Sequence, residues 1–301
     1  MSVLKNSKYA IPLVIIAGLI WSFGPLVVRN IDNAGSVPWQ YLFTRGIVIF
    51  FLLNIYLFFE EGVDLYKNYL NVGMSGITGG IGLATAMTCF ILSITKTTAA
   101  ITLLTLAAMP FITALLGFLF LKEKISLNVW ISIIVASIGI LVMAFGDNSL
   151  GSINGLIFGL LSATGFSVFS VSLRWRKETP KFTTVSLAGL FCSVLSGIII
   201  IQNDLNFLSS SKNESLFALH GTLVCLGLIL YSIGSKVIPA AELTLLSLTE
   251  IIGGIFWVWI PIFGINEVPS TNTIIGGFFL FMSIIYYSLT IKTNRRFIAL
   301  N

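Results

Sequence analysis

Long apolar stretches alternate with short polar segments along nearly the whole chain. A bilayer core about 30 Å thick requires about 20 residues of α-helix, so an apolar stretch of about 18 residues or more is a candidate membrane span. Ten such stretches occur, at residues 9–28, 39–59, 71–94, 98–121, 127–145, 152–173, 183–201, 216–234, 240–263 and 271–291. The pattern predicts an all-α integral membrane protein with ten transmembrane helices.

The first apolar stretch, preceded by Lys5 and Lys8, has the charge pattern of a signal peptide. It is about 20 residues long, the length of a full span, and no small-x-small cleavage site follows it. We therefore expect it to be retained as the first transmembrane helix.

The basic residues predict the orientation, because cytoplasmic loops of membrane proteins carry an excess of Lys and Arg. With a cytoplasmic N-terminus, the outer loops hold only Arg29, Lys96 and Lys212, and Arg45 lies within a span. The inner segments hold Lys5, Lys8, Lys67, Lys122, Lys124, Arg174, Arg176, Lys177, Lys181, Lys236, Lys292, Arg295 and Arg296. This bias predicts a multi-pass protein of the bacterial inner (cytoplasmic) membrane with both termini in the cytoplasm.

The composition excludes most other classes of protein. The chain is 56% hydrophobic and 10% charged, with a mean hydropathy of +0.98, whereas a soluble domain carries about 25% charged residues. Lys and Arg number 17 against 12 Asp and Glu, but they cluster in short loops without the interleaved aromatic residues of RNA-binding motifs. We therefore expect a lipid bilayer, and no nucleic acid, as a partner.

The sequence indicates no metal site, cofactor or catalytic residue. It contains one histidine and three cysteines, and Cys89, Cys192 and Cys225 lie at unrelated spacings inside apolar stretches. This pattern matches neither a disulfide framework nor a zinc site. The nucleotide-binding P-loop and the HExxH motif are both missing. Energy for transport would then come from gradients, unless a separate ATPase subunit exists.

Two motifs recur at nearly the same distance in the two halves of the chain. Residues 21–24 with Arg29 are echoed by residues 166–169 with Arg174, and residues 123–126 are echoed by residues 267–270. The offsets are 145 and 144 positions. Their agreement predicts an internal duplication, with a first five-helix repeat at residues 1–147 and a second at residues 148–301.

An odd number of helices in each repeat has a physical consequence. The second copy must enter the membrane from the opposite side, so the two repeats are inverted. Inverted repeats can exchange two conformations around a site near the bilayer midplane, which gives alternating access.

These motifs, in this order and spacing, resemble the EamA-type members of the drug/metabolite transporter superfamily. The resemblance covers nearly the whole chain and includes residues 17–24, Pro38 with Arg45, residues 97–110, Glu123, and residues 155–174, 240–250 and 267–270. It departs around residues 260–262, where the ninth span is a few residues longer than in the family pattern, so the register of that helix end is open.

The resemblance implies a central cavity lined by spans 1 to 4 and 6 to 9, with spans 5 and 10 outside. It also implies transport of a small metabolite. Members of the superfamily move amino acids, other metabolites, drugs or nucleotide-linked sugars, and the resemblance leaves the choice among these open.

Only two ionisable residues, Arg45 and Glu250, lie clearly inside a span. Charges in the hydrocarbon region rarely face lipid, so both are candidate substrate-binding residues. Arg45 would bind a carboxylate or phosphate, and Glu250 an amine or a coupling proton. The alternative is a permanent salt bridge between them, or an Arg45 side chain that extends outward to the interface.

Four further residues complete the candidate site. Trp21 and Trp257 would line the cavity and stack on a substrate, while Tyr41 and Thr44 would offer hydroxyl groups. The only histidine, His220, lies near the outer end of the eighth span and is interpreted as an interfacial residue.

The leading hypothesis is therefore a secondary transporter or exporter that moves a small metabolite, such as an amino acid, by alternating access. The alternative is an integral-membrane enzyme acting on a lipid-linked substrate, which would require a polar or acidic loop near the headgroups. The loops here are too short to supply one. A second copy of the chain, giving a homodimer, is left open as a partner.

Overall fold

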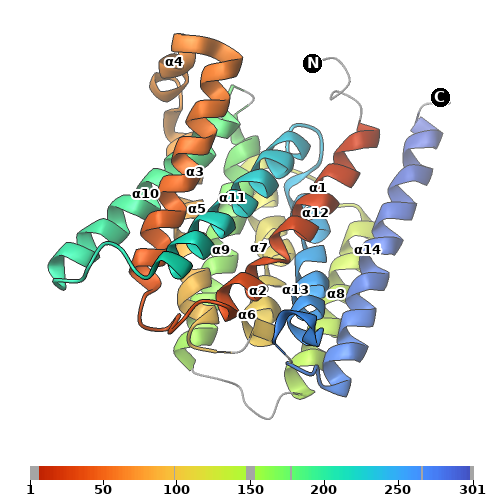
Figure 1. Cartoon of the computed structure of the whole chain (residues 1–301). Helices are drawn as coiled ribbons and strands as arrows, with labels where there is room; N and C mark the ends of the chain where they lie inside the picture. The colour runs from red at the N-terminus through yellow and green to blue at the C-terminus, as the bar shows by residue number, and fades with distance from the viewer. Residues whose placement is uncertain (1–6, 98, 147–152, 177, 266, 299–301) are drawn as a thin grey trace.

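Helices run up and down through the whole molecule, and the described residues contain no strand (Figure 1). The computed structural model describes residues 7–97, 99–146, 153–176, 178–265 and 267–298. Its α-helices are α1 (Ser7–Trp21), α2 (Gly24–Arg29), α3 (Pro38–Glu61), α4 (Leu65–Leu70), α5 (Gly73–Ile94), α6 (Ala99–Leu106), α7 (Met109–Leu116), α8 (Leu127–Gly146), α9 (Ile153–Trp175), α10 (Lys181–Gln202), α11 (Ser211–Gly234), α12 (Ala240–Ser247), α13 (Thr249–Trp259) and α14 (Thr271–Ile298). The all-α prediction is confirmed.

Within the described residues, eight segments are long and apolar enough to cross a membrane. They are Tyr9–Arg29, Pro38–Leu70, Gly73–Ile94, Thr102–Leu121, Ile153–Trp175, Lys181–Gln202, Ser211–Gly234 and Ala240–Trp259. The other two predicted spans are the helices α8 and α14, whose described apolar parts, Leu127–Gly139 and Ile274–Tyr287, are shorter. The chain is a multi-pass membrane protein, and the count of ten spans stays a prediction.

Three of the predicted spans are interrupted rather than continuous. α1 gives way to α2 just before Gly24 and Pro25, and α6 gives way to α7 just before Pro110. Proline lacks the backbone N–H that a continuing helix needs, so both breaks follow from the sequence. The third break, between α12 and α13 at Leu248, has no proline and is closed by an i→i+3 hydrogen bond from the Leu248 N–H to the Leu245 carbonyl oxygen at 3.3 Å.

The ninth predicted span, 240–263, ends earlier than the sequence indicates. α13 stops at Trp259, and residues Pro261–Phe263 form a separate 3₁₀ turn. Ile260 is extended, with ψ 121°, because a following proline disfavours the helical conformation. This is the place where the sequence left the register open.

Glycines bring pairs of helices from the two halves into close contact. A Cβ on Gly46 of α3 would lie 2.6 Å from the Gly189 carbonyl oxygen of α10, and a Cβ on Gly189 would lie 2.7 Å from that of Gly46. α5 and α9 meet in the same reciprocal way at Gly82 and Gly165. Small residues allow such backbone contacts in membrane helices.

The outward faces of several helices are apolar. Large exposed side chains include Phe51, Ile55 and Phe59 on α3 and Phe278 and Phe281 on α14. A soluble protein rarely exposes apolar surface of this kind. α8 and α14 pack against each other at one edge of the bundle (right in Figure 1), away from the interior where the broken helices meet.

Candidate functional site

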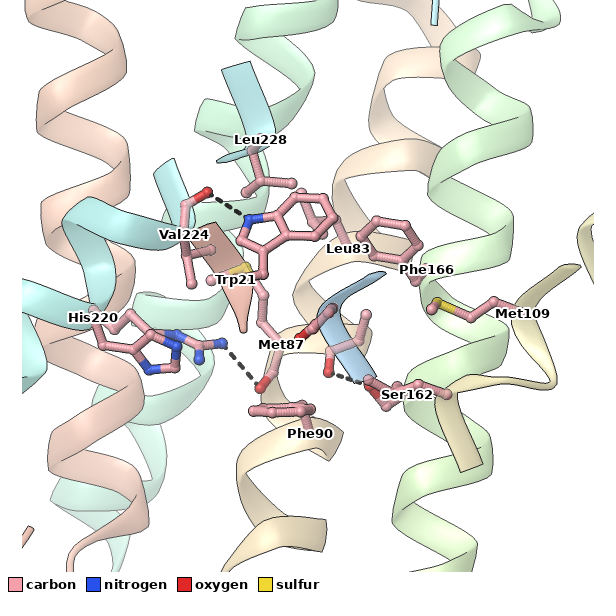
Figure 2. Close-up of a pocket in the computed structure, with 14 residues that line it drawn as sticks. Trp21, Leu83, Met87, Phe90, Met109, Ser162, Phe166, His220, Val224 and Leu228 are labelled. Atoms are coloured by element: carbon pink, nitrogen blue, oxygen red, sulfur yellow. Dashed lines mark hydrogen bonds between the residues drawn. The ribbon is translucent and has the colours of Figure 1, made fainter. Parts of the chain in front are cut away.

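A cavity lies inside the bundle, where α1, α3, α5, α6, α7, α9, α11 and α13 converge (Figure 2). The lining residues are Trp21, Arg45, Leu83, Ala86, Met87, Phe90, Leu106, Met109, Ser162, Phe166, His220, Val224, Leu228 and Glu250. A few polar groups thus converge within an apolar wall.

Arg45 brings a buried positive charge to the cavity from α3. The residue is only 2% exposed, and its Nη2 donates a hydrogen bond to the Met87 carbonyl oxygen at 3.1 Å. Its Nε is buried and has no partner in the part of the chain that the structure describes. A buried cation is stable only with a counter-charge or hydrogen-bond acceptors, so an anion in the cavity would complete this site.

Glu250 brings the opposite charge from α13. It is the second residue of that helix and lies in its first turn, where the helix dipole favours an anion. Among the described residues, none forms a hydrogen bond or an ion pair with the Glu250 carboxylate. This includes Arg45. The two charges share one cavity without neutralising each other through a direct bond.

The apolar wall is built around Trp21. Its indole Nε1 donates a hydrogen bond to the Val224 carbonyl oxygen at 3.2 Å, which fixes the ring (Figure 2). The indole meets Phe166 edge to face and Tyr231 at a tilt, both with centroids 5.6 Å apart. Trp21 thus lies in the cavity wall, and its contact with a substrate stays a prediction.

His220 lies in the cavity wall, which the sequence did not indicate. It is 2% exposed, so the interpretation as an interfacial residue is wrong. The Tyr41 hydroxyl is hydrogen-bonded to His220 Nδ1, and the Tyr41 ring stacks on Phe217 with centroids 4.7 Å apart. Tyr41 is fully buried behind the wall and holds the imidazole rather than reaching the cavity itself.

Two of the other candidates lie away from the cavity. The Thr44 hydroxyl donates a hydrogen bond to Glu214 Oε2 at 2.8 Å, near the start of α11. The Trp257 Nε1 donates one to the Ser22 Oγ at 2.9 Å, and its ring stacks on Phe23 with centroids 4.5 Å apart. Trp257 therefore fastens α13 to the break between α1 and α2, and it does not line the cavity.

Several lining residues could have been found by aligning the two halves. The offset of 145 positions that relates Trp21 to Phe166 also relates Leu83 to Leu228. Nothing in the sequence singles out Met87, and His220 carries no signal beyond its type. Within the described residues, no group of three or more His, Cys, Asp or Glu side chains is placed to hold a metal ion.

Sequence comparisons show that the chain is similar to transporters. Residues 8–145 match the EamA-like transporter family. The chain is 26% identical over 207 residues to an uncharacterized transporter of Helicobacter pylori strain 26695, and 27% identical over 207 residues to one of strain J99. Each alignment covers 67% of this chain and 67% of the relative. These matches point to a transporter rather than an enzyme.

A comparison with solved structures agrees on the fold. One crystal structure superposes with a TM-score of 0.74 at 18% sequence identity, covering 96% of this chain and 99% of that one. At this identity the match concerns the fold alone. It extends over nearly the full chain, including the second half that the family match does not reach.

Proposed function

We propose that this chain, an EamA-type member of the drug/metabolite transporter superfamily, is a secondary transporter that moves an amino acid or a related small metabolite by alternating access. The observation that carries the proposal is the pair of opposite charges, Arg45 and Glu250, in one mainly apolar cavity. Neither charge is neutralised by the other through an ion pair in the described residues.

The charges favour a solute that itself carries both signs. Arg45 would bind a carboxylate, since its guanidinium has an unpartnered buried Nε and forms paired hydrogen bonds with carboxylates well. Glu250 would bind an amine or carry the coupling proton. The side chain of the solute would lie against Trp21, Phe166 and the methionines Met87 and Met109, which adapt to apolar groups of different shape.

The arrangement of helices supports a ten-span protein built from two inverted repeats. The break between α6 and α7 and the break between α12 and α13 lie at matching places, since α6 begins at Ala99 and α12 at Ala240, an offset of 141. In secondary transporters, discontinuous helices of this kind form the site around which the repeats move. α8 and α14, the fifth and tenth predicted spans, lie outside that site.

Transport by purified protein tests the proposal. Proteoliposomes loaded with unlabelled amino acids should take up a radiolabelled mixture of the common amino acids by counterflow. Arg45→Leu should abolish this uptake, because the carboxylate loses its counter-charge, while the protein still inserts into the membrane. The matched control is Arg176→Leu, which removes an exposed arginine outside the cavity.

Two results would contradict the proposal. Full counterflow by the Arg45→Leu variant would show that Arg45 does not bind the substrate. In the second case, the protein shows no counterflow with any amino acid while a thermal-shift screen shows that another class of metabolite stabilises it. That pair of results would exclude amino acids as the substrate.

A further inference from the structure

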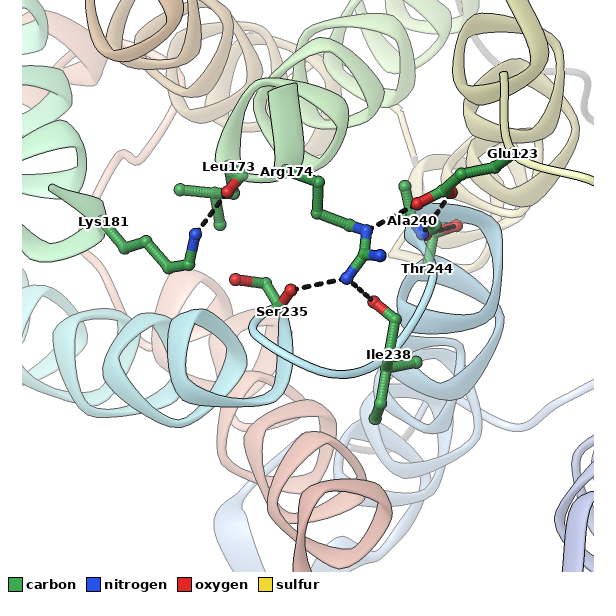
Figure 3. A network of polar contacts seen from close by, with 8 residues as sticks. All are labelled: Glu123, Leu173, Arg174, Lys181, Ser235, Ile238, Ala240 and Thr244. Atoms are coloured by element: carbon green, nitrogen blue, oxygen red, sulfur yellow. Dashed lines mark hydrogen bonds and ion pairs between the residues drawn. The ribbon is translucent and has the colours of Figure 1, made fainter. Parts of the chain in front are cut away.

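Arg174, in the last turn of α9, lies at the centre of a network of polar contacts (Figure 3). Its Nε forms an ion pair with Glu123 Oε1 at 2.6 Å. Its Nη1 donates hydrogen bonds to the carbonyl oxygens of Ser235 at 2.8 Å and Ile238 at 2.7 Å. The other carboxylate oxygen of Glu123 accepts the backbone N–H of Ala240, the first residue of α12, at 3.1 Å. We call this group the Arg174 network.

Arg29, the last residue of α2, has the same kind of surroundings. Its Nε forms an ion pair with Glu267 Oε1 at 2.6 Å. Its Nη1 and Nη2 donate hydrogen bonds to the carbonyl oxygens of Ile94 and Thr97, both at 3.4 Å. We call this group the Arg29 network.

The two networks correspond group by group. The offsets are 145 from Arg29 to Arg174, 144 from Glu123 to Glu267, and 141 both from Ile94 to Ser235 and from Thr97 to Ile238. In each network, an arginine in the last turn of a helix contacts a glutamate just before α8 or α14. It also contacts carbonyl oxygens at the end of α5 and just after it, or just after α11. The ion pair and the two arginine–carbonyl hydrogen bonds are thus built twice.

The networks lie at opposite ends of the cavity. A Cβ on Gly234, at the end of α11, would lie 3.6 Å from the carbonyl oxygen of Ala10 in the first turn of α1, so the Ser235 carbonyl is near the starting end of α1. Arg29 is at the other end of the span that α1 and α2 form. Figure 1 agrees, since α1 begins and α9 ends in the upper half of the view while α2 ends in the lower half.

We propose that the two networks are reciprocal latches, each of which must open for the cavity to open toward its own side. This inference rests on the proposed transport function and assigns positioning roles to Arg29, Arg174, Glu123 and Glu267. Each latch joins a span that reaches the cavity wall, Tyr9–Arg29 or Ile153–Trp175, to the segment that leads into a broken helix. Both arginine–glutamate ion pairs are formed in this structure.

The exposure of the pairs suits a latch that opens reversibly. The side chains of Arg174 and Glu123 are 22% and 19% exposed, and those of Arg29 and Glu267 are 25% and 38% exposed. Water can therefore hydrate the separated charges, which keeps the cost of opening far below that of a fully buried pair. Hydrogen bonds at 3.4 Å are weaker than those at 2.7–2.8 Å, so the Arg29 latch should open more readily.

Side-specific labelling of the cavity tests the latches. The reporter is Ala86→Cys, in the cavity wall, in a full-length background with Cys89, Cys192 and Cys225 replaced by serine. A membrane-impermeant maleimide is applied to intact cells and, separately, to inverted membrane vesicles. Glu123→Gln should raise the labelling rate from one side, and Glu267→Gln from the opposite side, each at least about fivefold, the lower end of a typical coupling between sites.

The pair of variants serves as its own matched control, because both remove one carboxylate charge from equivalent positions. Increases from the same side, increases from both sides in either variant, or no change in either one would overturn the proposal. If Glu123→Gln does not reach the membrane, Arg174→Lys takes its place, since lysine keeps the charge but loses the paired contacts to Glu123 and the carbonyls.

Failure of the latches is distinguishable from failure of the proposed function. Labelling requires no solute, so opposite-sided effects would stand even if amino acids were not transported. Conversely, normal counterflow by both glutamine variants together with unchanged labelling rates would contradict the latch proposal. The proposed substrate site would be unaffected by that result.

Discussion

The indole of Trp21 and the ring of Phe166 meet edge to face with centroids 5.6 Å apart, although 145 positions separate them in the sequence. The contact places matching positions of the two halves side by side in the cavity wall. It also makes the orientation of the Trp21 ring depend on the helices that surround it.

Gly227→Ala should displace the Trp21 indole without changing the Trp21 residue itself. A Cβ on Gly227 would lie 2.1 Å from the Trp21 Nε1, so either the indole or α11 must move, at a cost of about 1–3 kcal/mol. We expect a lower thermal midpoint in detergent and reduced counterflow. Gly277→Ala is the control, because nothing lies within 4 Å of its added Cβ, and it should leave both measurements unchanged.

Glu250→Gln should separate amine binding from proton coupling. The change keeps the shape of the side chain and fixes it as neutral. If Glu250 binds the substrate amine, counterflow is lost together with gradient-driven transport. If it carries the coupling proton, counterflow survives and only the dependence on a pH gradient disappears. A variant with full counterflow and full pH dependence would leave Glu250 as a packing residue.

Trp257→Phe should lower stability rather than substrate affinity. Phenylalanine keeps the contact with Phe23 but loses the hydrogen bond to Ser22 Oγ, worth about 1 kcal/mol. A double-mutant cycle with Ser22→Ala should recover this coupling in thermal unfolding. An increase in the KM for transport without any loss of stability would instead place Trp257 in the substrate site.

The charge bias of the loops predicts the topology. Reporter fusions after Asn301 and within residues 176–181 should report the cytoplasm, while fusions near residue 148 and residue 210 should report the outside. The reason is the excess of Lys and Arg in the segments assigned to the inner side. A C-terminal fusion that reports the outside would contradict the ten-span topology.

The sequence by itself determined the helices, two of their breaks and the two charges. Apolar stretches of sufficient length can satisfy their backbone in lipid only as helices, and Pro25 and Pro110 interrupt them where they stand. Arg45 and Glu250 were found because a charge inside a span is costly wherever the helix packs. These properties are local, so a single segment reveals them.

Only the tertiary structure decided which side chains reach the cavity. His220 and Trp257 both lie in apolar helices, and the face that each one turns inward depends on neighbours more than a hundred positions away. The break at Leu248 carries no proline signal, and Arg29 meets Glu267 only because packing brings together positions that lie 238 apart. Contacts of this kind depend on the mutual placement of whole helices, which no short segment of the sequence specifies.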